Sequence, residues 1–144
     1  MISVATWVIW LHLLAMATWL GGVTVQLFAI LPVMGARGEE ALATRRAHFI
    51  TSRGVDIVIL TGIMNVLLRG LASGWVFSRG FVAMLSIKLL LVAVMVGLQV
   101  WIGMVWKQEM EPTSVAVRKA RIAFTLQLIL GATVVLLGLG IRSV

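Results

Sequence analysis

Three polar side chains interrupt long apolar segments of the sequence: His12, Asn65 and Lys88. Polar groups inside a bilayer are costly, and those that occur there usually serve a function. If each segment is a helix with a rise of about 1.5 Å per residue, all three lie roughly 10–12 Å below the same membrane surface. A neutral imidazole binds metals, including haem iron, and a buried ammonium group is stabilised by an anion such as a porphyrin propionate. These residues therefore predict one ligand site built by three helices.

Four further side chains belong to this candidate site, two by helical spacing and two by their expected position at the membrane surface. Met16 lies one turn after His12 and Met84 one turn before Lys88, so each pair shares a face of its helix. Arg69 and Arg142 are expected near the same membrane surface, where a guanidinium either anchors the helix end at the interface, the preferred interpretation, or pairs with a propionate. The predicted cofactor-binding residues are therefore His12, Met16, Asn65, Arg69, Met84, Lys88 and Arg142, with His12 as the metal ligand. No catalytic residue is assigned, because the sequence shows neither a Ser/His/Asp set nor paired carboxylates at this depth.

A second set of polar residues, Gln26, Gln99 and Gln127, is expected nearer the opposite membrane surface. Amide side chains at membrane depth commonly hydrogen-bond between helices, and we expect this structural role for all three. His48 follows Arg45 and Arg46 in a polar segment, so we expect it in a solvated loop. That position is most of a ~30 Å bilayer away from the first histidine, so the two cannot ligate one haem within a single chain.

The elements that must position these residues are four apolar segments separated by short polar ones. Of the 144 residues, 61% are hydrophobic, and a helix needs about 20 apolar residues to cross a bilayer. The predicted fold is an all-α integral membrane protein, a bundle of four transmembrane helices that forms one membrane domain over residues 1–144. The helices are expected over about 4–31, 54–71, 81–106 and 122–141, and the polar loops over 32–53 and 107–121. The first loop has apolar residues at helical spacing (Ala43, Ala47 and Ile50), so part of it could form an interfacial helix that leads into the second helix.

The basic residues indicate which way the chain crosses the membrane. The loops over 32–53 and 107–121 carry four Lys or Arg each, whereas the remaining connection carries two and the C-terminal end one. Basic residues gather on the cytoplasmic side, so we expect an N-out/C-out, multi-pass protein of the bacterial inner (cytoplasmic) membrane. The net charge of +7 follows from this topology, and no nucleic-acid partner is expected. The absence of cysteine excludes disulfides and thiolate metal sites.

Four short motifs occur in the first three predicted helices and the loop before the second: Trp10-Leu11-His12-Leu13-Leu14, Trp19-Leu20-Gly21-Gly22, Arg45-Arg46 with Thr61-Gly62, and Lys88-Leu89-Leu90-Leu91. Together they resemble the copper-resistance D (CopD) membrane domain and the related HemJ-type protoporphyrinogen oxidase. The resemblance covers most of the chain, from about His12 to Val96. It implies a b-type haem with His12 as a ligand and Lys88 as a pocket residue, or, on the CopD side, copper handling.

Three functions therefore remain open. The first is a haem b protein that transfers electrons to a redox partner protein or oxidises a hydrophobic reductant, such as a porphyrinogen or a quinol. Whether it is an enzyme, a HemJ-like haem-dependent oxidoreductase, is left undecided. The second is copper uptake or handling, because the thioethers of Met16, Met64 and Met84 and the imidazole of His12 suit Cu(I). The third is a non-catalytic subunit of a larger membrane complex or a homo-oligomer, embedded in the lipid bilayer.

Overall fold

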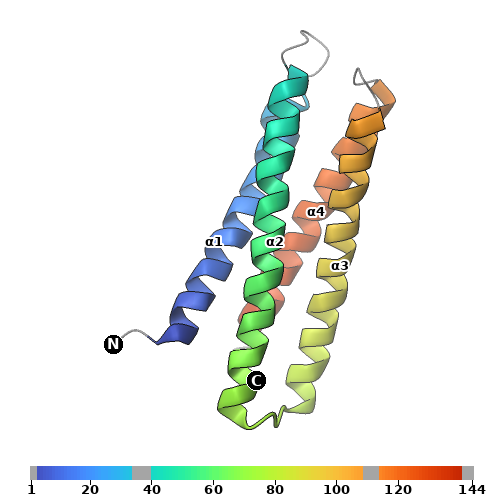
Figure 1. The fold of residues 1–144 in the computed structure, drawn as a ribbon. Helices are drawn as coiled ribbons and strands as arrows, with labels where there is room; N and C mark the ends of the chain where they lie inside the picture. Colours follow the sequence, from blue (N-terminus) through green and yellow to red (C-terminus); the bar gives the residue numbers. More distant parts are fainter. Residues whose placement is uncertain (1–2, 34–39, 109–113, 141–144) are drawn as a thin grey trace.

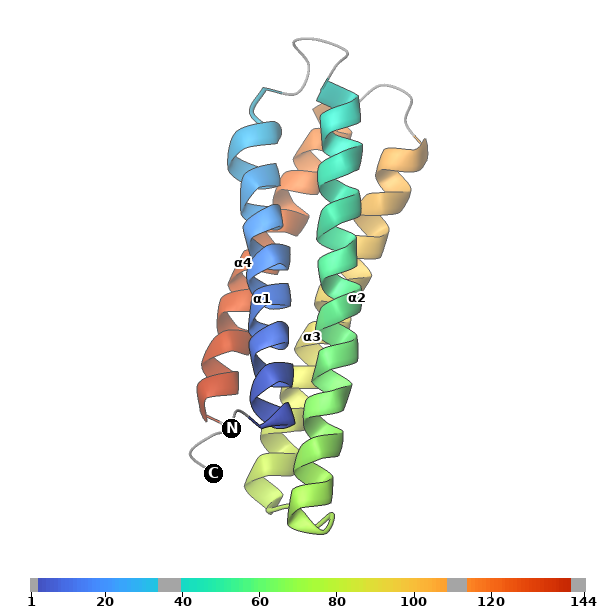
Figure 2. The same cartoon turned by 60° about the vertical axis from the view of Figure 1, so that its left-hand side comes forward.

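In the described part of the chain, four long helices lie side by side, each antiparallel to the one before it (Figures 1 and 2). The computed structural model describes residues 3–33, 40–108 and 114–140, and the side chains of 3–33, 46–106 and 114–138. The helices are α1 (Val4–Val25), which continues into the π-helical segment η1 (Gln26–Ile30), α2 (Glu40–Ser73), α3 (Arg79–Gln108) and α4 (Ser114–Gly140). Each is long and apolar enough to cross a membrane, and none of the described residues forms a strand. The predicted all-α, four-helix architecture is confirmed.

The bundle has two distinct ends. The end that carries the start of α1 and the turn between α2 and α3 is called the lower end (Figure 1). The end that carries η1 and the starts of α2 and α4 is called the upper end. The helix pairs α1–α2 and α3–α4 pack along most of their lengths, whereas the α2–α3 and α1–α4 interfaces are shorter. The bundle therefore consists of two helical hairpins that meet along two less extensive seams.

The turn at the lower end has a defined backbone structure. Gly74 and Trp75 both have positive φ, of 61° and 64°, and the N–H of Trp75 donates to the carbonyl of Gly70 at 2.8 Å. This bond satisfies a terminal carbonyl of α2 in the manner of a Schellman cap. The indole ring of Trp75 lies against Gly70, where an added Cβ would meet it at 2.7 Å. Phe77 then stacks on Phe81 with ring centroids 5.0 Å apart, which places three aromatic rings at this end.

Helices α2 and α4 extend further toward the upper end than the sequence pattern indicates. α2 begins at Glu40 instead of near residue 54, and α4 begins at Ser114 instead of near residue 122. At the start of α4, Ala116 and Ala120 are buried one turn apart, while the basic residues between them are exposed. Small apolar side chains at helical spacing give a basic segment a face that packs, so the helix continues beyond the apolar run.

The packed core occupies the upper part of the bundle. Trp19, Met95, Ile102 and Phe124 are almost completely buried there. Below this core the burial decreases on all four helices, although Gly70 and Phe81 are buried again at the lower turn. We define the lower third of the bundle by residues 4–14, 62–69, 82–94 and 135–138, and among these described residues none is buried. The helices therefore have a well-packed upper part and a loosely packed lower third.

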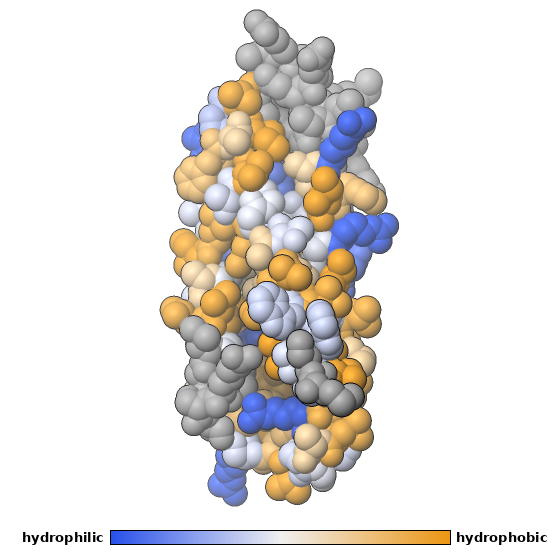
Figure 3. Space-filling model, turned by 90° about the vertical axis from the view of Figure 1, so that its left-hand side faces the viewer, coloured by the Kyte–Doolittle hydropathy of each residue, from blue (hydrophilic) through white to orange (hydrophobic). Residues whose placement is uncertain are grey.

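The outer surface of the bundle is strongly apolar. Large hydrophobic side chains are exposed on every helix, among them Trp7, Phe28, Leu60, Leu90 and Leu136. Figure 3 shows hydrophobic side chains over most of one face, with the strongly hydrophilic ones confined to a few positions. Soluble monomers rarely expose contiguous apolar surface on this scale. The surface therefore fits contact with a lipid bilayer.

Glycines allow α1 and α2 to approach closely. A Cβ added at Gly54 would lie 3.3 Å from the backbone nitrogen of Trp19. A Cβ added at Gly22 would lie 2.5 Å from Oγ1 of Thr51, whereas the neighbouring Gly21 faces open space. Small residues of this kind let the backbones of membrane helices come into contact.

Gly22→Ala should lower the free energy of unfolding by about 1–3 kcal/mol, because the added methyl group overpacks the α1–α2 interface. Gly21→Ala is the matched control one residue away, and it should leave stability unchanged or raise it by up to about 1 kcal/mol, since alanine is the better helix former. Denaturation in mixed detergent micelles measures both. Equal effects of the two substitutions would contradict the close contact at Gly22.

Candidate functional site

His12 lies in α1 at the boundary between the packed core and the lower third, and its ring faces α2. Its Nδ1 is 2.8 Å from the hydroxyl oxygen of Thr61. The ring also rests on Gly62, where an added Cβ would lie 3.5 Å from Cε1 of the imidazole. Both contacts come from α2, so the close packing of the first hairpin fixes the position of this ring.

The hydrogen bonds of Thr61 assign the tautomer of the His12 imidazole. The hydroxyl of Thr61 lies 2.6 Å from the carbonyl oxygen of Ile57, to which it donates its single hydrogen. Its oxygen is therefore an acceptor toward Nδ1 of His12, and Nδ1 carries the ring proton. The lone pair of the neutral ring is then on Nε2. A histidine whose one N–H is held by an acceptor is prepared to bind a metal through its other nitrogen.

Lys88 crosses from α3 toward α4. Its Nζ lies 3.5 Å from the position that a Cβ on Gly138 would take, so this glycine leaves room for the ammonium group. The side chain is half-buried. The one acidic side chain that the structure describes, Asp56, is exposed and forms an ion pair with Arg53 at 3.2 Å. The described part of the lower third therefore contains a cation and no carboxylate.

The other predicted site residues are distributed around this pair. Asn65 lies one turn beyond Thr61 on α2 and is half-buried, as is Met84 on α3. Met16 is buried in the core one turn above His12. Arg69 is exposed, with its guanidinium 4.3 Å from the centre of the Phe81 ring at the lower turn. Arg142 lies outside the described residues.

The sequence interpretation did not include Thr61 among the site residues, although the structure shows it as the partner of His12. The sequence spacing could have identified Thr61 as a site residue, because it precedes Asn65 by one helical turn and therefore lies on the same face of the helix.

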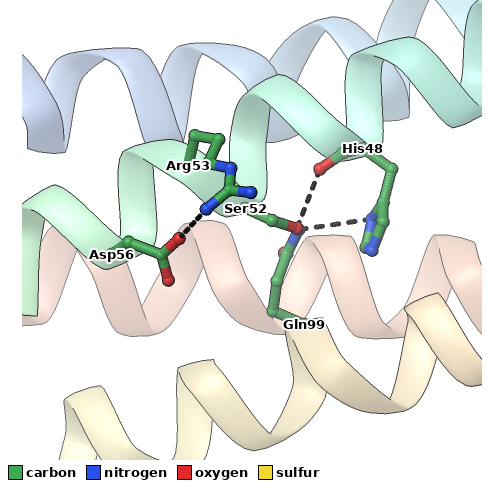
Figure 4. Close-up of polar contacts among 5 residues, drawn as sticks. All are labelled: His48, Ser52, Arg53, Asp56 and Gln99. Carbon is green, nitrogen blue, oxygen red and sulfur yellow. Dashed lines mark hydrogen bonds and ion pairs between the residues drawn. The ribbon is translucent and has the colours of Figure 1, made fainter.

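A second group of polar side chains crosses the upper part of the bundle. We call it the inner polar layer, and it consists of Gln26, His48, Thr51, Ser52, Gln99 and Gln127. Nε2 of Gln127 donates to Oε1 of Gln99 at 3.0 Å and to the carbonyl of Met95 at 3.1 Å. Nε2 of Gln99 then lies 3.3 Å from Nδ1 of His48 (Figure 4). The glutamines hydrogen-bond between helices, as expected.

The expectation of a solvated loop at His48 is wrong. This residue lies within α2, is half-buried, and contacts α3 through Gln99 and Gly103. An added Cβ on Gly103 would lie 2.8 Å from Nε2 of His48, so the glycine admits the ring between the helices. The two preceding arginines suggested solvent, but they occupy other positions around the helix, which turns the histidine inward.

The lower third combines three features in one place: a ligating nitrogen lone pair on α1, an ammonium group on α3, and an absence of buried residues in the described segments. Helical bundles hold cofactors between facing helices in such regions. An amphiphilic ligand with an anionic group would satisfy Lys88. The geometry supports binding of such a ligand by the two hairpins together.

Comparison of the chain with models of known protein families, with curated proteins and with solved structures gives no match. The resemblance to the CopD and HemJ proteins therefore stays a prediction drawn from the short motifs around His12, Thr61 and Lys88.

The hydrogen bonds predict opposite tautomers for the two histidines of the chain. His12 should carry its proton on Nδ1, whereas His48 should carry it on Nε2, because Gln99 donates to its Nδ1. ¹⁵N NMR of histidine-labelled protein in nanodiscs at neutral pH distinguishes the two forms. Thr61→Val should abolish the preference at the first histidine, while Thr61→Ser should keep it. The same tautomer at both positions would contradict the assignment.

Proposed function

We propose that this chain is a small b-type haem-binding redox protein that spans the bacterial inner membrane in the N-out/C-out orientation. In this orientation the lower third lies toward the outer face. The protein would transfer electrons to a partner, or oxidise a hydrophobic reductant such as a quinol or a porphyrinogen. The observation that carries the proposal is that His12 and Lys88 both lie in the lower third, where none of the described residues is buried.

The donor set at this site fits a haem. His12 offers Nε2 as an axial ligand, because Thr61 holds its other nitrogen. Lys88 offers an ammonium group to a propionate, and a charge-assisted bond of this kind is among the stronger ones in proteins. Gly62 and Gly138 keep side chains away from the imidazole and the ammonium group. When bound, the haem would supply one-electron chemistry, and its potential would depend on the axial ligand and on the polarity of the pocket.

The chain's own residues would perform three tasks around the cofactor. Thr61 orients the imidazole and keeps the correct nitrogen deprotonated. Lys88 compensates negative charge that would otherwise be costly inside a bilayer. The exposed apolar helices leave the site accessible from the lipid phase, which is where a hydrophobic reductant would be dissolved. Asn65, one turn from Thr61, is positioned to offer a further hydrogen bond at the same level.

The absorption spectrum of the purified protein tests the haem site. Protein produced with sufficient haem should show a Soret band, with α and β bands on reduction. His12→Ala should lose these bands, because it removes the axial ligand. His48→Ala is the matched control, a histidine outside the site, and it should keep the full haem content. A colourless wild-type protein, or equal loss in both variants, would contradict the proposal.

Copper handling is the second candidate, and the buried thioether of Met16 one turn from His12 favours it. Lys88 separates the two functions, because an ammonium group attracts a propionate and repels a metal cation. Lys88→Met should weaken haem binding by about 10- to 100-fold, as expected from losing a hydrogen bond to a charged group worth about 1.5–3 kcal/mol. Lys88→Arg, which keeps the charge, should have a smaller effect. Haem titration of the apoprotein measures both. Tighter Cu(I) binding by Lys88→Met, with no haem binding by either form, would support copper instead.

A further inference from the structure

An ion pair lies on the outer surface of α2, near the middle of its length. Arg53 and Asp56 are three residues apart and joined at 3.2 Å, and their side chains are 66% and 64% exposed (Figure 4). Because α2 runs from Glu40 to Ser73, sixteen of its residues precede Asp56 and seventeen follow it. At about 1.5 Å per residue, this carboxylate lies roughly 25 Å from either end of the helix.

The packing of α2 against α1 gives the same depth. Gly54 lies between the two charged residues in the sequence. A Cβ added to it would lie 3.3 Å from the backbone nitrogen of Trp19 and 3.5 Å from the carbonyl oxygen of Ala15. These two residues flank the midpoint of Val4–Ile30, the first of the helices long and apolar enough to cross a membrane. The ion pair is therefore level with the middle of its neighbouring helix as well.

A lipid bilayer is a poor environment for this ion pair. Charged side chains at the middle of a membrane are costly, and they almost always face protein or a water-filled cavity. Arg53 could extend its long side chain toward the membrane surface, but the short side chain of Asp56 cannot. The other exposed charged side chains that the structure describes all lie within eight residues of a helix end: Arg46, Arg69, Arg79, Arg118, Lys119 and Arg121. This face of α2 therefore needs a protein partner.

The ion pair belongs to a row of exposed residues along α2, which we call the outer stripe of α2. Its members are spaced alternately by four and three residues, and all are exposed: Phe49, Arg53, Asp56, Leu60, Ile63 and Leu67. This is the heptad spacing with which one helix packs its side chains into the surface of another. A polar position within an otherwise apolar stripe of this kind specifies the register and the number of helices. The outer stripe therefore has the pattern of a helix–helix interface.

The charges of the outer stripe are complementary to those of a second copy of the chain. In a two-fold symmetric dimer the same surface of each subunit meets itself, and copies inserted in the same direction have parallel α2 helices. Arg53 of one copy is then offset along the axis from Asp56 of the other by about 4.5 Å, at a typical interaxial distance of about 8–10 Å. An arginine side chain can span this separation. Among the described exposed residues, α1, α3 and α4 offer no charge at this depth, so the outer stripe itself is the matching surface.

We propose that the chain forms a parallel homodimer through the outer stripe of α2, in which Arg53 and Asp56 of both copies form one ring of four charges. Two acids and two bases then meet away from lipid, and their net charge is zero. Thr61, which holds His12, is buried and lies on the face of α2 that contacts α1. Each copy therefore keeps its own lower site, and the inference does not depend on which ligand that site binds.

Cysteine cross-linking tests the interface, because the chain has no cysteine of its own. In liposomes oxidised with copper phenanthroline, Leu60→Cys in the outer stripe should give a disulfide-linked dimer. Leu136→Cys is the matched control, since Leu136 is similarly exposed but lies on α4, which does not pack on α2, and it should stay monomeric. No dimer from Leu60→Cys, or equal amounts from both variants, would overturn the proposal. Neither variant changes the ion pair, so this arm does not rely on a charge variant folding.

Charge exchange tests the ring of four charges. Energy transfer between donor- and acceptor-labelled copies, in liposomes of decreasing protein-to-lipid ratio, measures dimerisation. Asp56→Arg brings four guanidinium groups together, which cannot lose their charge, so it should weaken dimerisation by at least about 10-fold. Adding Arg53→Asp restores opposite charges and should recover the wild-type affinity. Dimerisation of Asp56→Arg at the wild-type level would contradict the ring. A wild-type protein that is monomeric at every ratio would overturn the dimer and leave a different membrane protein as the partner of this face.

Discussion

The need to satisfy polar groups inside an apolar bundle organises this structure. The outer surface offers almost nothing to hydrogen-bond with, so each interior polar side chain must find its partner on a neighbouring helix or on its own backbone. Thr51 and Thr61 illustrate both routes, since each donates to the carbonyl one turn earlier. Thr61 accepts from His12 on α1, and Thr51 accepts from Gln26 on η1. These acceptors fix the rotation of α1 against α2. That rotation in turn determines which residues of α1 face the bundle interior.

The bundle has two levels that differ in burial. In the upper part, polar and apolar residues are both closely packed, and the inner polar layer connects all four helices into one unit. In the lower third the described residues lack a buried core, yet His12 and Lys88 are held there by contacts with Gly62, Thr61 and Gly138. The contrast between a well-buried upper part and a lower third without buried residues is the structural basis of the proposed haem site, since helical bundles hold such ligands between facing helices.

The two histidines show how a neighbouring side chain decides the chemistry of an imidazole. At His12 the partner is an acceptor, which leaves a lone pair available for a metal. At His48 the partner is the amide nitrogen of Gln99, whose direction is set by Gln127 and ultimately by the backbone carbonyl of Met95. Because the amide of Gln99 donates to Nδ1 of His48, the ring proton is on Nε2, and this nitrogen has no lone pair to offer a metal. One histidine is therefore suited to a cofactor and the other to holding helices together.

The sequence was sufficient to predict four spanning helices, because the length and spacing of apolar runs follow directly from the thickness of a bilayer. It also placed His12, Asn65 and Lys88 at one end, since depth along a helix can be counted in residues. It could not predict how far α2 and α4 continue, because their basic first turns look like solvated loops until small residues such as Ala116 and Ala120 are seen to pack. The partners of His12 and His48 depend on the rotation of each helix about its own axis. Close packing at Gly22, Gly54 and Gly103 fixes that rotation. These contacts join residues that are far apart in the sequence, so only the tertiary structure determines the partners of the two histidines.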